Sequence, residues 1–414
     1  MSGRREVILL SAFVVHPDMP SEPGIGWQFL TAALEHAHEH DMGVVLLTNR
    51  RSAAAVDGRV SERLRTRLVV VAVDIPFAPS FFRWHEPSFT RFEHEVWVRL
   101  AARRVPQIER DHRVLFAHHV TFATEILATP ITRSAPGVLR VWGPVGAGGV
   151  AAVYRMEPRS WASRRQWVMQ RARDGVAGTR ARSIARRCDL VIAQNTATAA
   201  AVSSTGVEVR VFPNVVVDGP TAVDRDEPRA PGALRLLVVG HLIPRKRPEL
   251  AVALLARPQL AEARMTFLGD ATVDFAAEVS DLADELGVRS RVTFAGVCDH
   301  RRVIDEMMHA DVLVHTSGRE GASGVVGEAS AVGLPVVCFG GTGAASVLEE
   351  AGTSGVVVDV MPTTTLDDVA DAVAAAAAMA RTITRMWTTA RFRYLIDDLA
   401  RVARARQATT EDVR

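Results

Sequence analysis

A group of cationic residues follows one predicted buried strand and could bind an anionic ligand. The run Leu234–Val239 is apolar, and the segment after it contains Gly240, Arg245 and Lys246. A glycine at the end of a strand, followed by cations at the start of a helix, lets backbone amides, the helix dipole and side-chain charge meet at one anion. This arrangement favours a diphosphate site. The alternative is a surface loop that is basic only because the chain is rich in arginine.

Two glutamates farther along the chain could bind hydroxyl groups. Glu320 and Glu328 enclose a loop of small residues, Ala322, Ser323 and Gly324, which leads into a predicted helix. Small residues allow backbone N–H groups to approach a ligand closely, and carboxylates accept hydrogen bonds from sugar hydroxyls. The spacing indicates a sugar-recognition site, and two solvated glutamates in a surface loop explain it equally well.

Short apolar runs alternate with longer amphipathic segments along the chain. The strands and helices that these runs and segments predict must position the residues named above. This pattern is typical of an α/β fold with parallel strands buried on both faces. In the first half the predicted strands are Val7–Phe13, Val44–Leu47, Leu68–Val73, Val114–Phe116, Val138–Trp142, Leu190–Ala193 and Val209–Phe212. In the second half they are Leu234–Val239, Met265–Leu268, Val292–Phe294, Val312–His315, Val336–Phe339 and Val356–Val358.

The segment 217–232 separates the two halves, since it is rich in Pro, Gly and charge and lacks periodicity. We therefore predict two domains, an N-terminal one at 1–217 and a C-terminal one at 218–385. Both are expected to be doubly wound and Rossmann-like, with a ligand in the cleft between them. The tail Trp387–Gln407 is amphipathic, and residues 386–414 are expected to form a helix that crosses back to the first domain.

Several motifs together resemble glycosyltransferase family 4, whose members are retaining enzymes of the GT-B fold. The resemblance is carried by the E-x7-E spacing of Glu320 and Glu328, the following Gly333-Leu334-Pro335 and the Gly-x-Leu-x-x-x-Lys loop Gly240–Lys246. Further similar segments are Phe212–Asp218, Ser21–Trp27 and Trp142–Gly148. They resemble the family's Pro-Asn-Gly-Val-Asp segment and the Ser-Glu-Pro-Gly-x-Gly-Trp and Gly-Pro-Val-Gly-Gly-Gly loops of a subgroup. The likeness covers almost the whole chain, and it is specific because all these motifs occur together.

The resemblance implies that 1–217 is the acceptor-side domain and 218–385 the nucleotide-sugar donor domain. It also implies roles for the residues that match these motifs. Lys246 resembles the lysine that neutralises the donor's diphosphate, Glu328 the carboxylate that binds the nucleotide ribose, and Glu320 the one that holds the donor sugar. The implied donor site is completed by Gly240, His241, Arg245, Ala322, Ser323 and Gly324. The family's chemistry implies cleavage of a nucleotide-sugar with retention and without a protein nucleophile, the leaving phosphate assisting the acceptor hydroxyl.

Three positions depart from the family pattern. His241 stands where the family has arginine, so that either its imidazolium replaces this phosphate cation or Arg245 or Arg247 supplies it. Ala322-Ser323 replaces the usual Phe-Gly pair, and Ala147 replaces the third glycine of the Gly-Pro-Val loop. These departures leave the charge pattern intact, and they leave open an unusual donor or a catalytically degenerate relative.

The candidate residues of the first domain are His118, Gly24 and Gly26. His118 and His119 follow the predicted strand Val114–Phe116, at the edge where ligands bind, and similar enzymes keep a histidine there beside the donor sugar. His118 is the closer match, with a buried histidine as the alternative. Gly24 and Gly26 open the first helix and would let its backbone approach the leaving phosphate, although a tight turn also explains them.

The composition excludes several classes of protein. With 414 residues, 48% hydrophobic and 23% charged, the chain is globular and long enough for two or three cores. The net charge of +2 is too small to indicate nucleic acid, and neither a bilayer-spanning run nor a signal peptide is apparent. Three widely spaced cysteines, Cys188, Cys298 and Cys338, predict neither disulfides nor zinc, so a reducing cytoplasm fits best.

Other motifs are weaker. Asp224-Arg225-Asp226 has the D-x-D pattern that binds metal in the other glycosyltransferase fold, but it lies in the linker and is interpreted as a solvated turn. No metal or cofactor is therefore expected. GxSxG and Walker A patterns are absent, which disfavours a serine hydrolase and a P-loop kinase. We interpret Gly340–Gly343 as a donor-phosphate contact rather than a dinucleotide loop.

The segment Arg155–Arg187 contains ten arginines and two acidic residues. Such a segment could face an anionic acceptor or make peripheral contact with a lipid surface. A solvated helix face explains it slightly better, because arginine supplies almost every cation of this chain: Lys246 is its one lysine.

The sequence thus predicts a cytoplasmic, metal-independent, retaining glycosyltransferase of carbohydrate biosynthesis, of the hexosyltransferase type. Its co-substrate would be a nucleotide-diphosphate sugar, and its acceptor a glycan, a lipid-linked molecule or a small natural product. The alternatives are a nucleotide-sugar epimerase of the same fold and a non-catalytic nucleotide-sugar binding protein.

Overall fold

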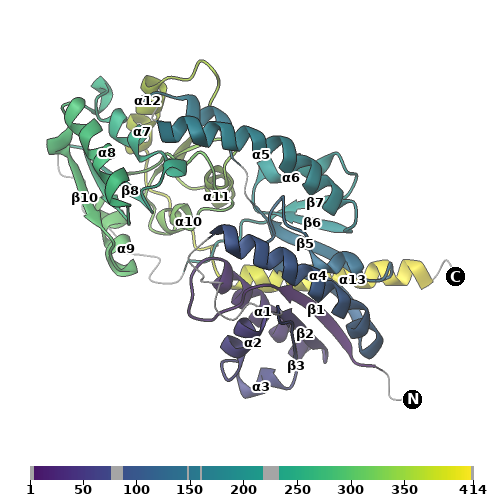
Figure 1. Ribbon diagram of the computed structural model, residues 1–414. Coiled ribbons are helices and arrows are strands. Elements are labelled where there is room, and N and C mark those ends of the chain that lie inside the picture. Colours follow the sequence, from purple (N-terminus) through teal and green to yellow (C-terminus); the bar gives the residue numbers. More distant parts are fainter. Residues whose placement is uncertain (1–3, 76–86, 147–148, 159–160, 218–232, 412–414) are drawn as a thin grey trace.

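The chain is organised around two parallel sheets, which the computed structural model describes for residues 4–75, 87–146, 149–158, 161–217 and 233–411 (Figure 1). The first sheet contains β1 (Glu6–Ala12), β2 (Gly43–Thr48), β3 (Leu68–Ala72), β4 (Arg113–Thr121), β5 (Leu139–Val145), β6 (Leu190–Ala193) and β7 (Glu208–Val211). The second contains β8 (Arg235–Val239), β9 (Arg264–Leu268), β10 (Val292–Gly296), β11 (Val312–His315), β12 (Val336–Phe339) and β13 (Gly355–Val358).

The strand order makes both halves doubly wound. The first sheet runs β3-β2-β1-β4-β5-β6-β7 and the second β10-β9-β8-β11-β12-β13, and all the described pairings are parallel. The order reverses between β1 and β4 and again between β8 and β11, which are the points where such sheets bind ligands. The prediction of two Rossmann-like halves is confirmed, and each predicted strand overlaps an observed one.

Helices cover both faces of the first sheet. They are α1 (Glu22–Glu39), α2 (Arg50–Val56), α3 (Glu62–Arg65), α4 (Pro87–Asp111), α5 (Trp161–Ala185), α6 (Thr196–Ser203) and α13 (Ala390–Glu411). Successive strand residues alternate between two cores, because strand side chains point to opposite faces. Leu10 packs in one core with Phe29 of α1 and Phe392 of α13, whereas Leu9 belongs to the other core with Trp97 of α4.

The second sheet is covered in the same way. Its helices are α7 (Pro248–Leu254), α8 (Val273–Glu285), α9 (His300–His309), α10 (Gly324–Ala331), α11 (Gly343–Ala351) and α12 (Leu366–Ala377). Val314 of β11 packs with Leu250 of α7, and the neighbouring Leu313 packs with Val326 of α10 on the opposite face. The apolar runs of the sequence are therefore buried on both sides, as a parallel sheet requires.

The tail helix α13 returns to the first half, as predicted, but it begins later than expected. The sequence predicts a helix from Trp387, whereas α13 begins at Ala390 and continues to Glu411. Trp387 is buried in a core of the second half, and its Nε1–H donates to Ser330 Oγ at 2.9 Å. Its carbonyl accepts from the N–H of Val217, so tertiary contacts hold this segment outside the helix.

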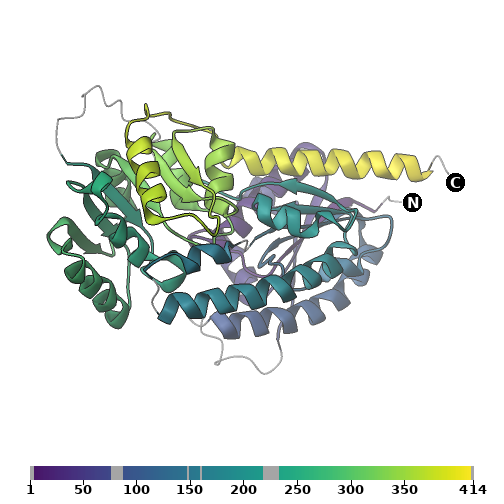
Figure 2. The same ribbon diagram turned by 90° about the horizontal axis from the view of Figure 1, so that it is seen from above.

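Residues 149–158 connect the two halves. By sequence they follow β5, yet Val153 and Met156 belong to a core of the second half. The N–H of Val150 donates to the carbonyl of Gly318 at 2.7 Å. Helix α5 then runs from the second half into the first (Figure 2), since Ser163 Oγ donates to Glu249 of α7 and Ile184 packs in a core of the first sheet.

Within the described residues, no helix is both long and apolar enough to cross a membrane. Ala147, Gly148 and the Asp224–Asp226 pattern lie outside the described residues.

Candidate functional site

The loop after β8 and the loop between β11 and α10 meet at the ligand-binding edge of the second sheet. Strands β8 and β11 are neighbours in that sheet, and their carboxyl ends lie at its reversal point. The short 3-10 helix η3 (Pro244–Lys246) follows β8, and Glu320 lies in the loop between β11 and α10. The structure therefore brings Lys246 and Glu320, which are separated by 74 positions, into one site.

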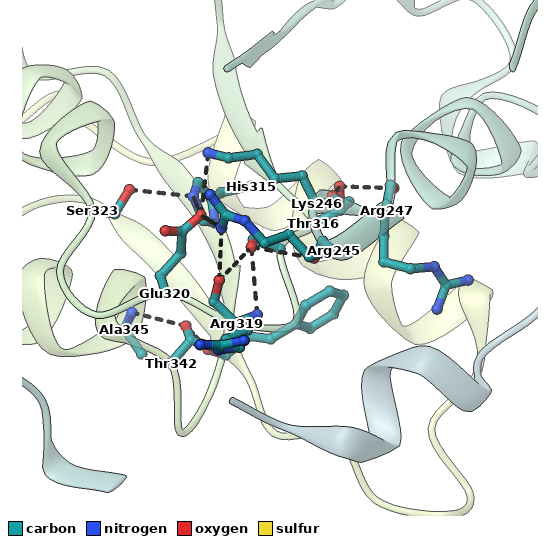
Figure 3. Close-up of polar contacts among 12 residues, drawn as sticks. Arg245, Lys246, Arg247, His315, Thr316, Arg319, Glu320, Ser323, Thr342 and Ala345 are labelled. Carbon is teal, nitrogen blue, oxygen red and sulfur yellow. Dashed lines mark hydrogen bonds and ion pairs between the residues drawn. The ribbon is translucent and has the colours of Figure 1, made fainter. Parts of the chain in front are cut away.

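Glu320 is the centre of a charge cluster (Figure 3). One carboxylate oxygen, Oε1, lies 3.1 Å from Lys246 Nζ and 3.1 Å from Arg245 Nη1. The Glu320 side chain is only 12% exposed. Burial alone would raise the pKa of Glu320, but the charges of Lys246 and Arg245 lower it to about 2. The carboxylate therefore stays ionised at every working pH and acts only as a hydrogen-bond acceptor.

Gly240 makes room for the Lys246 ammonium group. The glycine has a φ of 127°, which L side chains rarely adopt, and a Cβ there would lie 2.8 Å from Lys246 Nζ. Only glycine allows the ammonium to lie against the end of β8. A cation held against a strand end in this way suits a phosphate oxygen.

His315 belongs to this site and was not identified from the sequence. It is the last residue of β11, buried, with Nε2 3.2 Å from Ser323 Oγ and 3.9 Å from Glu320 Oε1. Burial, together with the charge of Lys246, lowers the pKa of His315 to about 4, so its imidazole is neutral. Its position at the carboxyl end of a predicted strand could have identified His315 as a candidate site residue.

Glu328 occupies a separate position on α10. Its Oε1 lies 3.0 Å from Nε2 of His300, at the start of α9. Burial raises the pKa of Glu328, and the His300 contact opposes this shift. Ser323 is buried in front of α10, whereas a Cβ at Gly324 would meet nothing within 4 Å, so the first turn of the helix is open to a ligand.

The Gly340–Gly343 loop packs against the loop that contains Glu320. The N–H of Gly343 donates to the Glu320 carbonyl at 3.1 Å, and a Cβ at Gly343 would collide with the carbonyl of Gly321. Thr342 caps α11, accepting from the N–H of Ala345 at 3.5 Å. The Gly340–Gly343 loop thus supports the Glu320 loop, and its contact with a donor phosphate stays a prediction.

Of the two arginines offered as replacements for the family's phosphate cation, Arg247 is excluded by the structure. Its side chain is fully buried and points away from Glu320, with Nε 2.6 Å from Glu249 Oε1. Its Nη2 donates to the carbonyls of Met156 at 2.9 Å and Pro158 at 2.8 Å, and its Nη1 donates to the carbonyl of Val153. His241 is exposed, and Arg245 remains as the second cation of the site.

His118 and His119 lie inside β4 rather than after it, because β4 continues to Thr121. His118 Nε2 lies 2.7 Å from the carbonyl oxygen of Gly143, and its ring packs edge-on against Phe29. Burial lowers the pKa of His118 to about 4, so it is neutral. None of the described polar contacts joins it to the Glu320 cluster, and a catalytic role for His118 stays a prediction.

Packing accounts for the glycines of the first helix. A Cβ at Gly24 would collide with the carbonyl of Met19, and a Cβ at Gly26 would lie 2.5 Å from the carbonyl of Val14. Both contacts are with backbone, which cannot move aside easily. The tight-turn explanation therefore suffices for these glycines, and their contact with a leaving phosphate stays a prediction.

The first half contacts the site through residues that sequence reasoning missed. Asn195, after β6, donates from Nδ2 to the carbonyl of Gly321 at 2.7 Å. The N–H of Thr196 donates to Ser346 Oγ of α11 at 3.2 Å. The Tyr154 hydroxyl donates to the carbonyl of Arg245 at 3.2 Å. The two halves therefore meet at their carboxyl-end loops, next to the charge cluster.

The arginine-rich segment forms α5, and its exposed face is not only polar. Trp161, Val168, Met169 and Val176 are exposed along one side of the helix. Exposed arginines of the same helix flank them: Arg164, Arg165, Arg171 and Arg180. Apolar residues flanked by cations are typical of helices that lie on anionic lipid surfaces.

Comparison with known proteins agrees with this geometry. Residues 222–385 match the family described as glycosyl transferases group 1. This region is therefore similar to group 1 glycosyltransferases. The predicted resemblance is thereby confirmed at that level. By sequence alone, no curated protein is similar to the chain.

Solved structures show the same fold over nearly the whole chain. Sucrose-phosphate synthase from Thermosynechococcus elongatus is 17% identical, with a TM-score of 0.53 over 99% of this chain and 98% of that one. WaaG, a glycosyltransferase involved in lipopolysaccharide biosynthesis, is 16% identical, with a TM-score of 0.51 over 95% and 94%. Anabaena HepE in complex with UDP is 16% identical, with a TM-score of 0.51 over 95% and 98%. The chain therefore has the GT-B fold.

Among the described residues, no group of three or more His, Cys, Asp or Glu side chains is arranged to hold a metal ion. The cations of the site are protein side chains, Lys246 and Arg245.

Proposed function

We propose that the chain is a retaining hexosyltransferase that moves a sugar from a nucleotide-diphosphate donor to an acceptor hydroxyl. The observation that carries this proposal is the contact of Lys246 and Arg245 with Glu320 at the reversal point of the second sheet. HepE, which shares the fold, was solved in complex with UDP, and this supports a nucleotide diphosphate as the donor's leaving group.

In this proposal Lys246 and Arg245 stabilise the charge that develops on the leaving diphosphate, and the open first turn of α10 adds backbone N–H groups. Glu320 accepts hydrogen bonds from hydroxyls of the donor sugar, and Glu328 accepts them from the ribose. The bond between the anomeric carbon and the diphosphate oxygen breaks, the acceptor oxygen forms the new glycosidic bond on the same face of the sugar, and the acceptor proton passes to the leaving phosphate oxygen. No protein nucleophile or metal ion takes part.

The pKa of Glu320 favours transfer over epimerisation. An epimerase would need a carboxylate base near the sugar, and a general base is most effective when its pKa lies near the working pH. The pKa of Glu320 is about 2, so this carboxylate is a poor base. A non-catalytic binding protein would use the same contacts without turnover, so this alternative needs an activity assay.

The experiment is to incubate the purified protein with a panel of nucleotide-sugars, with and without EDTA, after a thermal-shift screen selects the donors that stabilise it. We expect transfer or slow hydrolysis that EDTA does not reduce, and an anomeric configuration that NMR shows to be retained. An epimerised sugar would indicate the epimerase, and stabilisation without turnover the binding protein. Activity that EDTA abolishes and manganese restores would contradict the metal-independent mechanism.

A further inference from the structure

The loop between β11 and α10, which contains Glu320, depends on the rest of the molecule for its conformation. Gly318 and Gly321 lie on either side of Glu320 in the sequence. Glycine has the freest backbone of all residues, so ordering it costs the most conformational entropy. The position of the Glu320 carboxylate is therefore set by the contacts that other elements make with this loop.

The two carbonyl groups at Glu320 and Gly321 are each held from outside the loop. The Glu320 carbonyl accepts from the N–H of Gly343, in the second half, at 3.1 Å. The Gly321 carbonyl accepts from Asn195 Nδ2, in the first half, at 2.7 Å. The backbone at Glu320 is thus fixed by both halves of the chain.

Asn195 is itself firmly held. Its side chain is fully buried at the start of α6, where Oδ1 accepts from the N–H of Thr198 at 2.8 Å. The adjacent Gln194, whose Nε2 donates to the carbonyl of Pro144 at 3.1 Å, also packs against the loop, because a Cβ at Gly321 would lie 2.1 Å from Gln194 Oε1. The first half therefore presents a rigid surface to the Glu320 loop.

The neighbouring cations make this restraint useful. Glu320 Oε1 lies 3.1 Å from both Lys246 Nζ and Arg245 Nη1 (Figure 3). In a partly buried site, opposite charges at this distance attract each other more strongly than in water. A carboxylate on a mobile loop would follow the two cations and compete with the diphosphate instead of meeting the sugar hydroxyls.

We propose that Asn195 is a positioning residue, which holds the loop so that the Glu320 carboxylate faces the donor sugar. This inference rests on the proposed function, in which Glu320 accepts hydrogen bonds from hydroxyls of that sugar. Small displacements of a group that contacts the reacting molecule lower the rate strongly, even when the group itself is intact. The donor-sugar site is then complete only where the first half contacts the second.

The variant Asn195→Ser separates this role from the capping of α6. Serine caps a helix about as well as asparagine does, so the contact with the N–H of Thr198 is kept. The variant lacks the Nδ2 group that donates to the Gly321 carbonyl.

Asn49→Ser is the matched control. Asn49 caps α2 in the same way, since its Oδ1 accepts from the N–H of Ser52 at 2.8 Å and its Nδ2 donates to the carbonyl of Phe13 at 2.6 Å. The substitution removes the same kind of hydrogen bond, and the described contacts of Asn49 do not include the Glu320 loop.

The first measurement needs no turnover. Hydrogen exchange over residues 317–324, followed by mass spectrometry, should be about fivefold faster in Asn195→Ser than in the parent, the scale of one lost hydrogen bond. Asn49→Ser should leave this exchange unchanged. Parent-like exchange of the loop in Asn195→Ser would overturn the proposal.

The second measurement uses the nucleotide-sugar that the donor panel identifies. Asn195→Ser should lower kcat about tenfold, whereas calorimetry should show unchanged binding of the corresponding nucleoside diphosphate, because Lys246 and Arg245 remain. In a Glu320→Ala background, Asn195→Ser should lower kcat by less than about twofold, since the carboxylate through which it acts is gone.

Equal losses of kcat from Asn195→Ser in the parent and in the Glu320→Ala background would overturn the proposal, because Asn195 would then act independently of Glu320. A parent-like kcat of Asn195→Ser would do the same. Failure of the proposed function is a different result: the parent itself would show neither transfer nor hydrolysis with any nucleotide-sugar.

Discussion

Lys246 is the single lysine of a chain in which arginine supplies the other cations. The structure gives a reason why this position has lysine rather than arginine. Its ammonium lies against Gly240, where even a methyl group would approach to 2.8 Å. A planar guanidinium is broader than an ammonium and cannot occupy that space in the same way. The compact ammonium of Lys246 would therefore determine both the shape and the charge of the proposed phosphate site.

From this we expect Lys246→Ala to reduce transition-state stabilisation by about 3 to 5 kcal/mol, since it removes a preorganised charge from the leaving group. Lys246→Arg should recover only part of that loss. Both are measured as kcat/KM for the donor, with thermal unfolding as the control for folding. Parent-like activity of Lys246→Arg would contradict the shape argument, and an active Lys246→Ala would move the diphosphate site elsewhere.

The two glutamates should have separable effects, because they belong to different contacts. Glu328→Gln should raise the KM of the donor more than it lowers kcat, since a ribose contact is equal in the ground and transition states. Glu320→Gln should chiefly lower kcat. It should not weaken binding of the nucleotide diphosphate, because Lys246 and Arg245 lose a competing carboxylate. Small and equal effects of both substitutions on kcat/KM would mean that neither glutamate contacts the donor.

At the scale of elements, the junction of η3 and α7 is held by one buried ion pair. Arg247 has a φ of 53°, in the left-handed region that costs a non-glycine residue roughly 1 to 2 kcal/mol. Its ion pair with Glu249 and its bonds to three carbonyls of the segment 153–158 offset this cost. The same side chain thus fixes the loop after β8 and the segment that joins the two halves.

Arg247→Met should lower the free energy of unfolding by about 3 to 5 kcal/mol, because it leaves the Glu249 carboxylate buried without its cation. The double variant Arg247→Met/Glu249→Gln should recover much of this loss. Urea unfolding of the parent, the single variant and the double variant measures both effects. A single variant within about 1 kcal/mol of the parent would show that the pair contributes little.

Helix α5 is the element to test for contact with lipid. Its exposed apolar residues and flanking arginines lead us to expect binding to vesicles that contain phosphatidylglycerol, and none to pure phosphatidylcholine. Trp161→Ser/Val168→Ser should reduce the bound fraction several-fold, and added salt should reduce it further. Cosedimentation measures both. Equal partitioning of the parent and the double variant would leave α5 as a solvated face.

At the scale of the whole molecule, buried neutral histidines set the response to acid. Burial lowers the pKa of His94 to about 3 and those of His118 and His315 to about 4, and it lowers that of His119 well below its ordinary value. Above pH 6.5 these groups are neutral in both the folded and the unfolded chain. Below pH 6.5 the unfolded chain binds protons that the folded chain cannot bind, so stability falls as the pH falls.

We expect the free energy of unfolding to fall between pH 6 and pH 5, since each of these histidines contributes a slope of about 1.4 kcal/mol per pH unit. His94→Phe should reduce the slope by one histidine's share. It should also stabilise the protein at pH 7, because both ring nitrogens of His94 are buried without hydrogen-bond partners in the described residues, and the ring packs against Phe13 and Phe122. Urea unfolding at pH 5, 6 and 7 tests this, and a pH-independent free energy would contradict it.

Local sequence pattern is sufficient to predict the two sheets and the two loops that meet at the charge cluster. Each strand of a doubly wound sheet is a continuous apolar run, because both of its faces are buried, and the ligand-binding edge lies after such runs. Lys246 and Glu320 were therefore found from local pattern alone. Periodicity and composition contain this information without any knowledge of which segments touch.

Contacts between distant parts of the chain determine which of the neighbouring polar residues face the site. Arg245 and Arg247 are two positions apart, yet one contacts Glu320 and the other is buried against the segment 153–158. His118 was expected at the end of a strand and lies within one. A local pattern specifies which face of an element is apolar, whereas the partner of each polar group is set by contacts between residues far apart in the chain.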